Sequence, residues 1–361
     1  MIELNRPLYQ FEKRIEEEPT NANAGLWYDK FFDLWKKDFK GIMEIEQKSG
    51  KHIWINRFVE NQNSSIGEPY LLSELHRRQR TLIEKKEGLV VTLTNTSPFV
   101  TGLGLNHPVE NGFKWHHTLG VPYLPGSSIK GLIREWAENW EGCSDIERIF
   151  GESKEGVGSV IILDALPVKP TKIKCDIMTP HYSPYYSGDE PPADWHPPTP
   201  IPFLVTDKDQ IFQMGIIPRK HNPACKKDCE LVFQWLKNVI IKLGAGAKTA
   251  VGYGRFEVEK AKSPEEEWII KHVSDLIEEH GLELDSRIEK LANKYGVRTE
   301  FLAVLNGAPT VLAELWGEME EGELKNKVKD VIVKTLKQVN LWNSSRKAIK
   351  SAQEIYEKDN S

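Results

Sequence analysis

The spacing of hydrophobic and polar residues divides the chain into three regions. Residues 1–87 are polar with apolar positions at helical spacing, which predicts a helical N-terminal region packed on a core. Residues 88–260 alternate β-branched runs with amphipathic stretches, which predicts one core domain of strands and helices. Residues 261–361 read as amphipathic helices, and the first starts where Ser263 can cap and Pro264 can open it. The pattern predicts an α+β protein with a helical C-terminal extension.

Aromatic residues in the N-terminal region recur near helical spacing, and the simplest interpretation is a helix that packs on the core. These residues are Trp27, Phe31, Phe32 and Trp35. Residues 61–67 are polar and are predicted to form a loop, and residues 74–86 are predicted to form another helix. In the C-terminal extension, residues 325–350 are rich in lysine, which we interpret as a solvated helix face.

The core domain is predicted to begin with a strand, a helix and a strand, as a ferredoxin-like (RRM-like) fold does. The predicted strands are Gly88–Thr94, Ser159–Ala165, Phe203–Thr206, Gln210–Ile217 and Gly252–Val258. The predicted helices are Ser127–Trp140, Ile146–Phe150 and Glu230–Leu243, the last burying Leu231, Val232, Trp235, Leu236, Val239 and Ile240. Because the strand at residues 159–165 is apolar at its centre, we expect it inside the sheet.

Residues 171–202 form an insertion rich in proline, tyrosine and histidine. Prolines at this density disfavour regular structure, so the insertion is predicted to be an extended arm or loop. Its aromatic rings could stack on unpaired bases or could pack the loop against its own domain.

Composition and charge are those of a globular protein of the cytoplasm. The 361 residues are 39% hydrophobic and 28% charged, no apolar run is long enough to cross a bilayer, and the N-terminus lacks a signal peptide. The four cysteines are too few and too scattered for a disulfide framework. Residues 261–361 hold 15 Lys and Arg against 19 Asp and Glu, which leaves 33 against 34 for residues 1–260. A core so close to neutral is unlike a protein that binds nucleic acid tightly and alone.

Two segments more than a hundred residues apart suit the binding of a polyanion. In the first, residues 121–134, Pro125 and Gly126 form a turn, and Ser127 or Ser128 is predicted to cap the following helix. Lys130 and Arg134 then lie four residues apart on one face, close to free N–H groups at the helix start. In the second, residues 243–258, the glycines allow close approach of a ligand to the backbone around a central Lys-Thr pair. They are Gly244, Gly246, Gly252 and Gly254, and the pair is Lys248 and Thr249.

Together these segments resemble the RAMP proteins of CRISPR systems, in which a P-G-S-S-[IL]-K-G segment opens a helix and a glycine-rich loop follows later. The finer similarity is to the sixth subunit of type III-B (Cmr) effector complexes, and the resemblance covers residues 20–258. It is supported by segments at Asn23–Phe31, Thr101–Pro108 and Met178–Tyr182.

The resemblance implies a non-catalytic subunit that binds guide RNA near its 3′ end, in a complex that defends against foreign nucleic acid. Its partners would be the guide RNA, target RNA through the complex, and other RAMP subunits, with no membrane, small-molecule substrate, cofactor or metal. The candidate RNA-binding residues are Ser127, Ser128, Lys130, Arg134, Gly244, Gly246, Lys248, Thr249, Gly252, Tyr253, His116 and His117. Contacts to phosphate and ribose would not depend on guide sequence.

Other chemistries fit the residues less well. Ala247 and Lys242 stand where a P-loop requires glycine, and position 249 lacks the third glycine of a dinucleotide fingerprint. Cys225 and Cys229 follow His221 but have no adjacent second ligand pair for zinc, Cys175 and His181 being the only candidates nearby.

Two alternative functions remain open. The first is a metal-independent endoribonuclease that processes CRISPR transcripts, in which His107, His116 or His117 would act as general base and Lys130 would stabilise the developing charge. The loop from Asn95 to Tyr123 contains no Asp for target cutting, and its only carboxylate is Glu110. The second alternative is a purely structural capping subunit.

Overall fold

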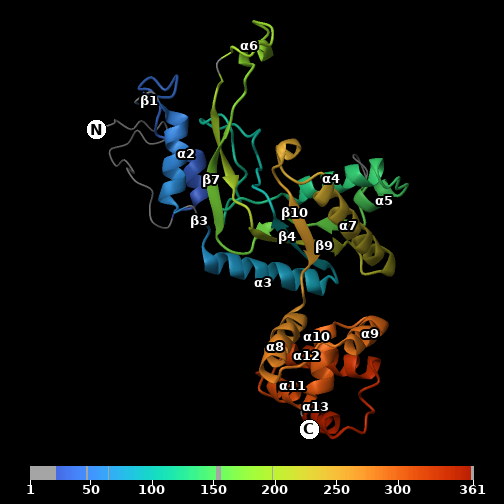
Figure 1. Cartoon of the computed structure of the whole chain (residues 1–361). Helices are drawn as coiled ribbons and strands as arrows, with labels where there is room; N and C mark the ends of the chain where they lie inside the picture. Colours follow the sequence, from blue (N-terminus) through green and yellow to red (C-terminus); the bar gives the residue numbers. More distant parts are fainter. Residues whose placement is uncertain (1–21, 46–47, 64, 152–155, 197, 359–361) are drawn as a thin grey trace. The chain divides into compact units, whose positions relative to one another are not determined.

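The computed structural model describes residues 22–45, 48–63, 65–151, 156–196 and 198–358, and these divide into two compact units with the boundary between residues 261 and 262 (Figure 1). Helices and antiparallel strands both contribute, so the chain is α+β as predicted. The helical character predicted for residues 1–21 falls outside the described residues. Within the described residues, no helix combines the length and the apolar character that a membrane crossing requires.

The central sheet of the first unit has the strand order β10-β4-β9-β5, and every pair is antiparallel. Its strands are β4 (Leu89–Asn95), β5 (Val160–Ile162), β9 (Ile211–Pro218) and β10 (Phe256–Lys260), and β6 (Leu166–Pro167) also pairs with β9. The prediction that residues 159–165 form an interior strand is wrong, because β5 is three residues long and lies at the edge. Its apolar side chains are explained by the helices packed on it: Val160 is buried in the helix-covered core.

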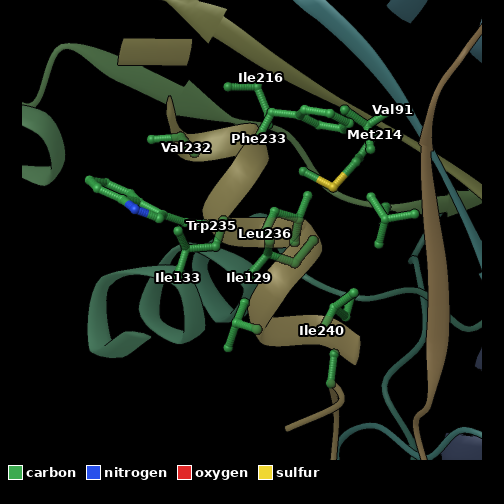
Figure 2. Packing of buried hydrophobic residues seen from close by; sticks show 14 of the residues in the cluster. Val91, Ile129, Ile133, Met214, Ile216, Val232, Phe233, Trp235, Leu236 and Ile240 are labelled. Atoms are coloured by element: carbon green, nitrogen blue, oxygen red, sulfur yellow. The ribbon is translucent and has the colours of Figure 1, made fainter. Parts of the chain in front are cut away.

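Two helices cover one face of this sheet. They are α4 (Gly126–Asn139) and α7 (Pro223–Lys242), with the short α5 (Ile146–Phe150) between them in the chain. Figure 2 shows Ile129 of α4 and Leu236 of α7 packed with Met214 of β9. Helix α7 begins seven residues before the predicted start at residue 230, because the Asn222 side chain accepts a hydrogen bond from the Cys225 N–H. Leu231, predicted to be buried, is 39% exposed.

Helix α3 (Pro69–Lys85) covers the opposite face of the sheet. Its Ile83 packs with Val90 and Ile217 and leaves no space beside Gly215, where an added Cβ would lie 2.5 Å from the Ile83 Cδ1. The buried His76 of α3 bonds to the Pro167 carbonyl oxygen. The predicted helix at residues 74–86 is therefore present and begins five residues earlier, and the core has three layers.

The insertion forms a hairpin arm that extends away from the central sheet (Figure 1). Its strands β7 (Thr171–Met178) and β8 (Ile201–Thr206) pair with each other, β3 (Ser65–Ile66) pairs with β7, and α6 (Ser183–Tyr186) lies at the tip. The prediction of an insertion without regular structure is wrong at its base. The prolines are compatible with this because most lie between the two strands, and Pro202 lies in β8, an edge strand. The strand predicted at residues 203–206 belongs to this second sheet and not to the central one.

A separate aromatic core holds the N-terminal elements against the base of the arm. These elements are α1 (Ala24–Lys30), β1 (Glu44–Ile45), β2 (Lys48–Ser49) and α2 (Gly50–Asn61). Helix α1 ends at Lys30, so of the four spaced aromatic residues only Trp27 is helical. Trp27, Phe31 and Phe32 are nevertheless buried with Trp54 and Trp115, which confirms the packing interpretation for them.

The second unit consists of helices around its own core of apolar side chains, among them Leu276, Trp316, Ile332 and Tyr356. They are α8 (Pro264–His280), α9 (Ser286–Tyr295), α10 (Thr299–Gly307), α11 (Pro309–Gly317), α12 (Glu323–Gln338) and α13 (Lys347–Lys358). The predicted start of α8 is confirmed, with Ser263 as N-cap in a capping box with Glu266. The solvated lysine face has one exception, because Lys325 is only 3% exposed and donates to the Gly317 carbonyl oxygen.

Candidate nucleic-acid interface

A cleft of about 800 Å³ joins the two segments that the sequence singled out. One part of its lining comes from α4, at Ser128, Ile129 and Leu132. A second part comes from residues 243–255, called here the glycine loop, which contains the single 3₁₀ turn η1 (Thr249–Val251). A third part is the turn at residues 101–104, which belongs to residues 96–123, called here the histidine loop. Segments that are more than a hundred residues apart in the sequence therefore share one cleft.

The start of α4 is capped from another element and not by its own serines. Pro125 occupies the N-cap position without a side-chain cap, and the Gly126 N–H donates to Asp164 Oδ1 at 2.7 Å. The predicted capping by Ser127 or Ser128 is wrong, because the helix begins at Gly126 and both serines are already in its exposed first turn. Gly126 is required here, since a Cβ would lie 2.4 Å from the Ile162 carbonyl oxygen of β5.

Three of the four glycines in the glycine loop approach protein backbone. An added Cβ at Gly244, Gly246 or Gly254 would lie 2.6, 2.3 or 2.0 Å from a backbone carbonyl oxygen. All three have positive φ, which only glycine adopts without strain. Gly252 also has a φ of +99°, but nothing lies within 4 Å of its added Cβ, so it is the glycine that faces open space.

Two cations line the cleft, and neither belongs to the predicted set. Lys242, the last residue of α7, lies with its Nζ 5.2 Å from the centre of the Trp136 ring. Arg255, the last residue of the glycine loop, donates to the Lys242 carbonyl oxygen at 2.9 Å and to the Thr249 carbonyl oxygen at 3.1 Å, so its guanidinium joins the end of the loop to its beginning and its middle. None of the described residues that line the cleft is acidic. The cleft is therefore positive although the whole chain carries a net charge of −5.

Lys130 and Arg134 lie on a different face of α4, outside the described lining of the cleft. Arg134 donates to the Gly151 carbonyl oxygen, and Arg219, after β9, donates to the Gly158 carbonyl oxygen. These two glycines touch, since an added Cβ at Gly151 would lie 2.9 Å from the Gly158 nitrogen. Burial, and then the charges of Arg219 and Arg134, lower the pKa of Lys130. The structure thus collects a second group of cations on this face.

Lys248 and Tyr253 connect the glycine loop to the base of the arm. The Tyr253 hydroxyl donates to Asp176 Oδ2 at 2.6 Å, and burial together with this bond raises the pKa of Tyr253 to about 12. Lys248 adopts a positive φ, and its Nζ lies 5.8 Å from the centre of the Phe203 ring. Both side chains hold the loop against β7 and β8, and neither lines the cleft.

His107 has a structural position in the histidine loop. Its Nδ1 accepts from the Val109 N–H at 3.1 Å, so the neutral ring carries its proton on Nε2, which donates to the Tyr28 carbonyl oxygen at 2.9 Å. The ring also stacks on Tyr28 with 4.4 Å between centres. Burial lowers the pKa of His107 to about 4. Both ring nitrogens are occupied, so neither is free to accept a proton from a ribose.

His116 and His117 lie outside the described lining of the cleft, and His117 lies beside the start of α1. The His116 Nδ1 bonds to the Thr118 hydroxyl at 3.1 Å, and burial lowers the pKa of His116. His117 is exposed, and its carbonyl oxygen accepts from the Asn23 side chain. Glu110, the only carboxylate of the histidine loop, pairs with Lys51 at 2.6 Å. Glu110 and one ring nitrogen of His116 are thus engaged with other partners, whereas the His117 side chain is exposed.

No group of three or more His, Cys, Asp or Glu side chains in the described part of the chain is arranged to hold a metal ion. Cys225 and Cys229 are buried on one side of α7, and burial raises the pKa of Cys229 to about 12. His221 pairs instead with Glu87. A thiol held in the protonated form, as that of Cys229 is, is a poor zinc ligand.

Sequence reasoning missed three residues that shape the site: Asp164, Lys242 and Arg255. The cap by Asp164 joins residues 38 positions apart, which no local motif reveals. Lys242 and Arg255 had a weak signal, because Lys242 directly precedes the glycine loop and Arg255 is its last residue. A lysine in the last turn also complements the C-terminal end of the helix dipole.

Comparison with known proteins identifies relatives for the first unit. Residues 92–257 match the family model described as RAMP superfamily. A protein of Pyrococcus furiosus named CRISPR system Cmr subunit Cmr6 is 31% identical over 44% of this chain and 64% of its own length. The Saccharolobus solfataricus protein of the same name is 31% identical over 42% of this chain and 50% of its own length. The chain thus spans between half and two thirds of these relatives.

A solved structure shares the fold. A chain in the cryo-EM structure of the type III-B Cmr-beta complex bound to cognate target RNA aligns with a TM-score of 0.51 and 20% identity. The alignment covers 67% of this chain and 92% of that chain. At this identity the likeness is evidence of fold alone.

Proposed function

We propose that this chain is a guide-RNA-binding, non-catalytic subunit of a type III-B CRISPR effector complex, because residues 92–257 match the RAMP-superfamily model and the chain resembles Cmr6. Its place would be near the 3′ end of the guide. Its partners would be other RAMP subunits and, through the complex, target RNA. The complex would act in defence against foreign nucleic acid.

The observation that carries this proposal is the cleft between α4, the turn at residues 101–104 and the glycine loop. Its lining combines exposed backbone, the Ser128 hydroxyl and two cations, and contains no carboxylate among the described residues. Such a lining suits phosphate and ribose, which are the same at every position of a guide. A subunit that must accept any spacer requires contacts of this kind.

The finer fold assignment, a ferredoxin-like core, belongs to the same proposal. Along the chain, the central elements run β4, α4, β5, β9, α7 and β10, and the sheet order is β10-β4-β9-β5. This is a β-α-β-β-α-β arrangement with both helices on one face. It places the helix start and the glycine loop at the same end of the domain.

The absence of catalysis is proposed from the histidine loop. Cleavage through a ribose 2′-hydroxyl requires a base that can accept a proton close to the bound phosphate. His107 uses both ring nitrogens for protein contacts, and Glu110 is paired with Lys51. Neither His116 nor His117 belongs to the described lining of the cleft.

The test is to co-express the full chain with the genes that neighbour its own and to sequence the RNA that co-purifies. We expect guide RNA with a constant 5′ tag, in a complex with other RAMP subunits. The variant Lys242→Gln should leave the protein complex intact and reduce its RNA content. Unchanged RNA in this variant would support the structural cap instead.

A second assay addresses catalysis directly. The full chain is incubated alone with repeat-derived transcripts, without metal, and the products are separated by size. We expect no cleavage. Cleavage that is lost in His116→Ala or His117→Ala would establish the processing nuclease and overturn the proposal.

A further inference from the structure

Two tryptophans follow, along the chain, the α4 residues that line the cleft. Ser128 and Leu132 line the cleft, and Trp136 and Trp140 follow at successive intervals of four residues. Residues four apart lie on one face of a helix. At 1.5 Å per residue, the line runs about 18 Å from Ser128 to Trp140. Trp136 therefore follows Leu132 by about one turn on the same side of α4, and Trp140 is the C-cap residue of that helix.

The tryptophan pair is rigid and presents one open ring. Trp136 and Trp140 stack with 5.1 Å between ring centres and 4° between planes. Trp136 is buried, and its Nε1 donates to Glu141 Oε1 at 2.8 Å, which fixes its orientation. Trp140 is 63% exposed, with one ring face covered by Trp136. A large exposed ring held in place by a buried one is a stacking surface that is already ordered.

Lys242 connects the tryptophan pair with the cleft. Its side chain lines the cleft, and its Nζ lies 5.2 Å from the centre of the Trp136 ring. A phosphate at Lys242 would place the adjoining base beside the pair. We infer that Trp140 is a stacking site for one unpaired base of the RNA strand that lies in the cleft. This inference rests on the proposed function.

The charges around Trp140 limit the site to one base. The end of α4 and the residues just after it carry Glu135, Glu138 and Glu141, which disfavour a phosphate backbone running past Trp140. Each is engaged: Glu135 with Asn139, Glu138 with Arg134, and Glu141 with Trp136. The carboxylates do not repel a stacked base as they repel a phosphate, because the ring face is uncharged. Base stacking on an aromatic ring is independent of sequence and adds about 1–3 kcal/mol per base. The strand therefore ends or turns away at this position.

The test uses the full chain and short single-stranded RNAs that carry the fluorescent base 2-aminopurine at one position at a time. Stacking quenches this fluorophore, so one position should lose fluorescence on binding. Trp140→Ala should restore the fluorescence and weaken binding about tenfold, the equivalent of 1.4 kcal/mol. Trp140→Phe should retain most of both effects. The control is Tyr70→Ala, an aromatic residue that is 70% exposed on α3, on the opposite face of the sheet.

An abasic RNA completes the design. With the base removed at the quenched position, the native chain and Trp140→Ala should bind equally, because both lack the same contact. Suppose that Lys242→Gln weakens RNA binding but Trp140→Ala changes the fluorescence at no probe position. This result would overturn the stacking site and leave the proposed function standing. If the only effect of Trp140→Ala is that the co-expressed complex loses a neighbouring subunit, the stacking site is likewise overturned and the proposed function stands. If neither the native full chain nor the co-purified complex that contains it holds RNA, the proposed function and the stacking site both fail.

Discussion

The histidine loop and the glycine loop both contribute to the cleft, and each uses its most conspicuous residues to hold its own shape. In the histidine loop, His107 is bonded through both ring nitrogens. In the glycine loop, Gly244, Gly246 and Gly254 lie against backbone carbonyl oxygens, and only Gly252 faces open space. Residues that suggest ligand chemistry in a sequence can thus be the ones that maintain the site, while the ligand meets the neighbouring open positions.

The two loops depend on different physical conditions. The glycine loop needs a backbone conformation that other residues adopt only with strain, which is independent of pH. The histidine loop needs a neutral imidazole at residue 107, and the charge of an imidazole changes with pH. Substitutions in the first loop and acid in the second should therefore separate their contributions.

The largest effect is expected for Gly254→Ala. The φ of Gly254 is +67°, and an added Cβ would lie 2.0 Å from the Ala245 carbonyl oxygen, so the loop backbone must move. Left-handed strain of about 1–2 kcal/mol and the clash should together lower the free energy of unfolding by about 3 kcal/mol or more. In a thermal melt this corresponds to a midpoint about 6–12 °C lower, and RNA binding should be lost.

Gly252→Ala is the matched control for this change. Its φ is also positive, at +99°, but nothing lies within 4 Å of the added Cβ. Only the backbone strain remains, so its midpoint should fall by less than that of Gly254→Ala. Equal losses for the two variants would contradict the view that the glycines differ in role.

The next largest effect is the loss of folding stability in acid that His107 should cause. Its pKa is about 4 in the folded protein and about 6.5 when unfolded, so the folded state favours the neutral ring. The stability from this preference is complete above pH 6.5 and is lost as the pH falls toward 4. The loss should reach about 2–3 kcal/mol, measured by denaturation across this pH range.

His107→Gln tests the assignment of that pH dependence. An amide can replace both hydrogen bonds but does not titrate, so this variant should be less stable at neutral pH and lose less stability on acidification. His117→Gln, at an exposed position, should keep the native pH profile. A native profile in His107→Gln would assign the acid sensitivity to another group.

Periodicity predicted the core elements well where one face of an element is buried. In α7, Val232, Leu236 and Ile240 recur at helical spacing and are buried as predicted. The pattern could not locate the start of this helix, because its first two turns are polar and depend on the Asn222 cap. Leu231 shows the other limit, since spacing alone does not say how wide the buried face is.

The arm shows how one signal can obscure another. Residues 171–174 alternate between buried and exposed positions, which is the pattern of a strand with one buried face. The prolines of the whole insertion outweighed this short alternation in the prediction. Prolines restrict only the residues beside them, so the base of the arm was free to pair.

The site was predictable as a pair of segments and not as a set of side chains. The sequence indicated that the Ser128 and Gly246 segments belong together, and both line one cleft. Which cations face that cleft depends on helix orientation, which places Lys242 on the lining and Lys130 on another face of α4. The cap by Asp164 likewise depends on how β5 meets α4.

The smallest predicted effect distinguishes the cleft from the face of α4 that carries Lys130, by removing one charge at a time. Lys242→Gln removes a cation from the end of the glycine loop and should weaken RNA binding severalfold at low salt. For a single strand, the slope of log affinity against log salt should fall by about 0.7 for each lost phosphate contact. Lys130→Gln should change neither quantity if the RNA follows the cleft, although Lys130 stands in the segment that first suggested RNA binding. The reverse result would place the RNA across the face formed by Lys130, Arg134 and Arg219. The glycine loop would then be a structural element throughout, as the histidine loop is at His107.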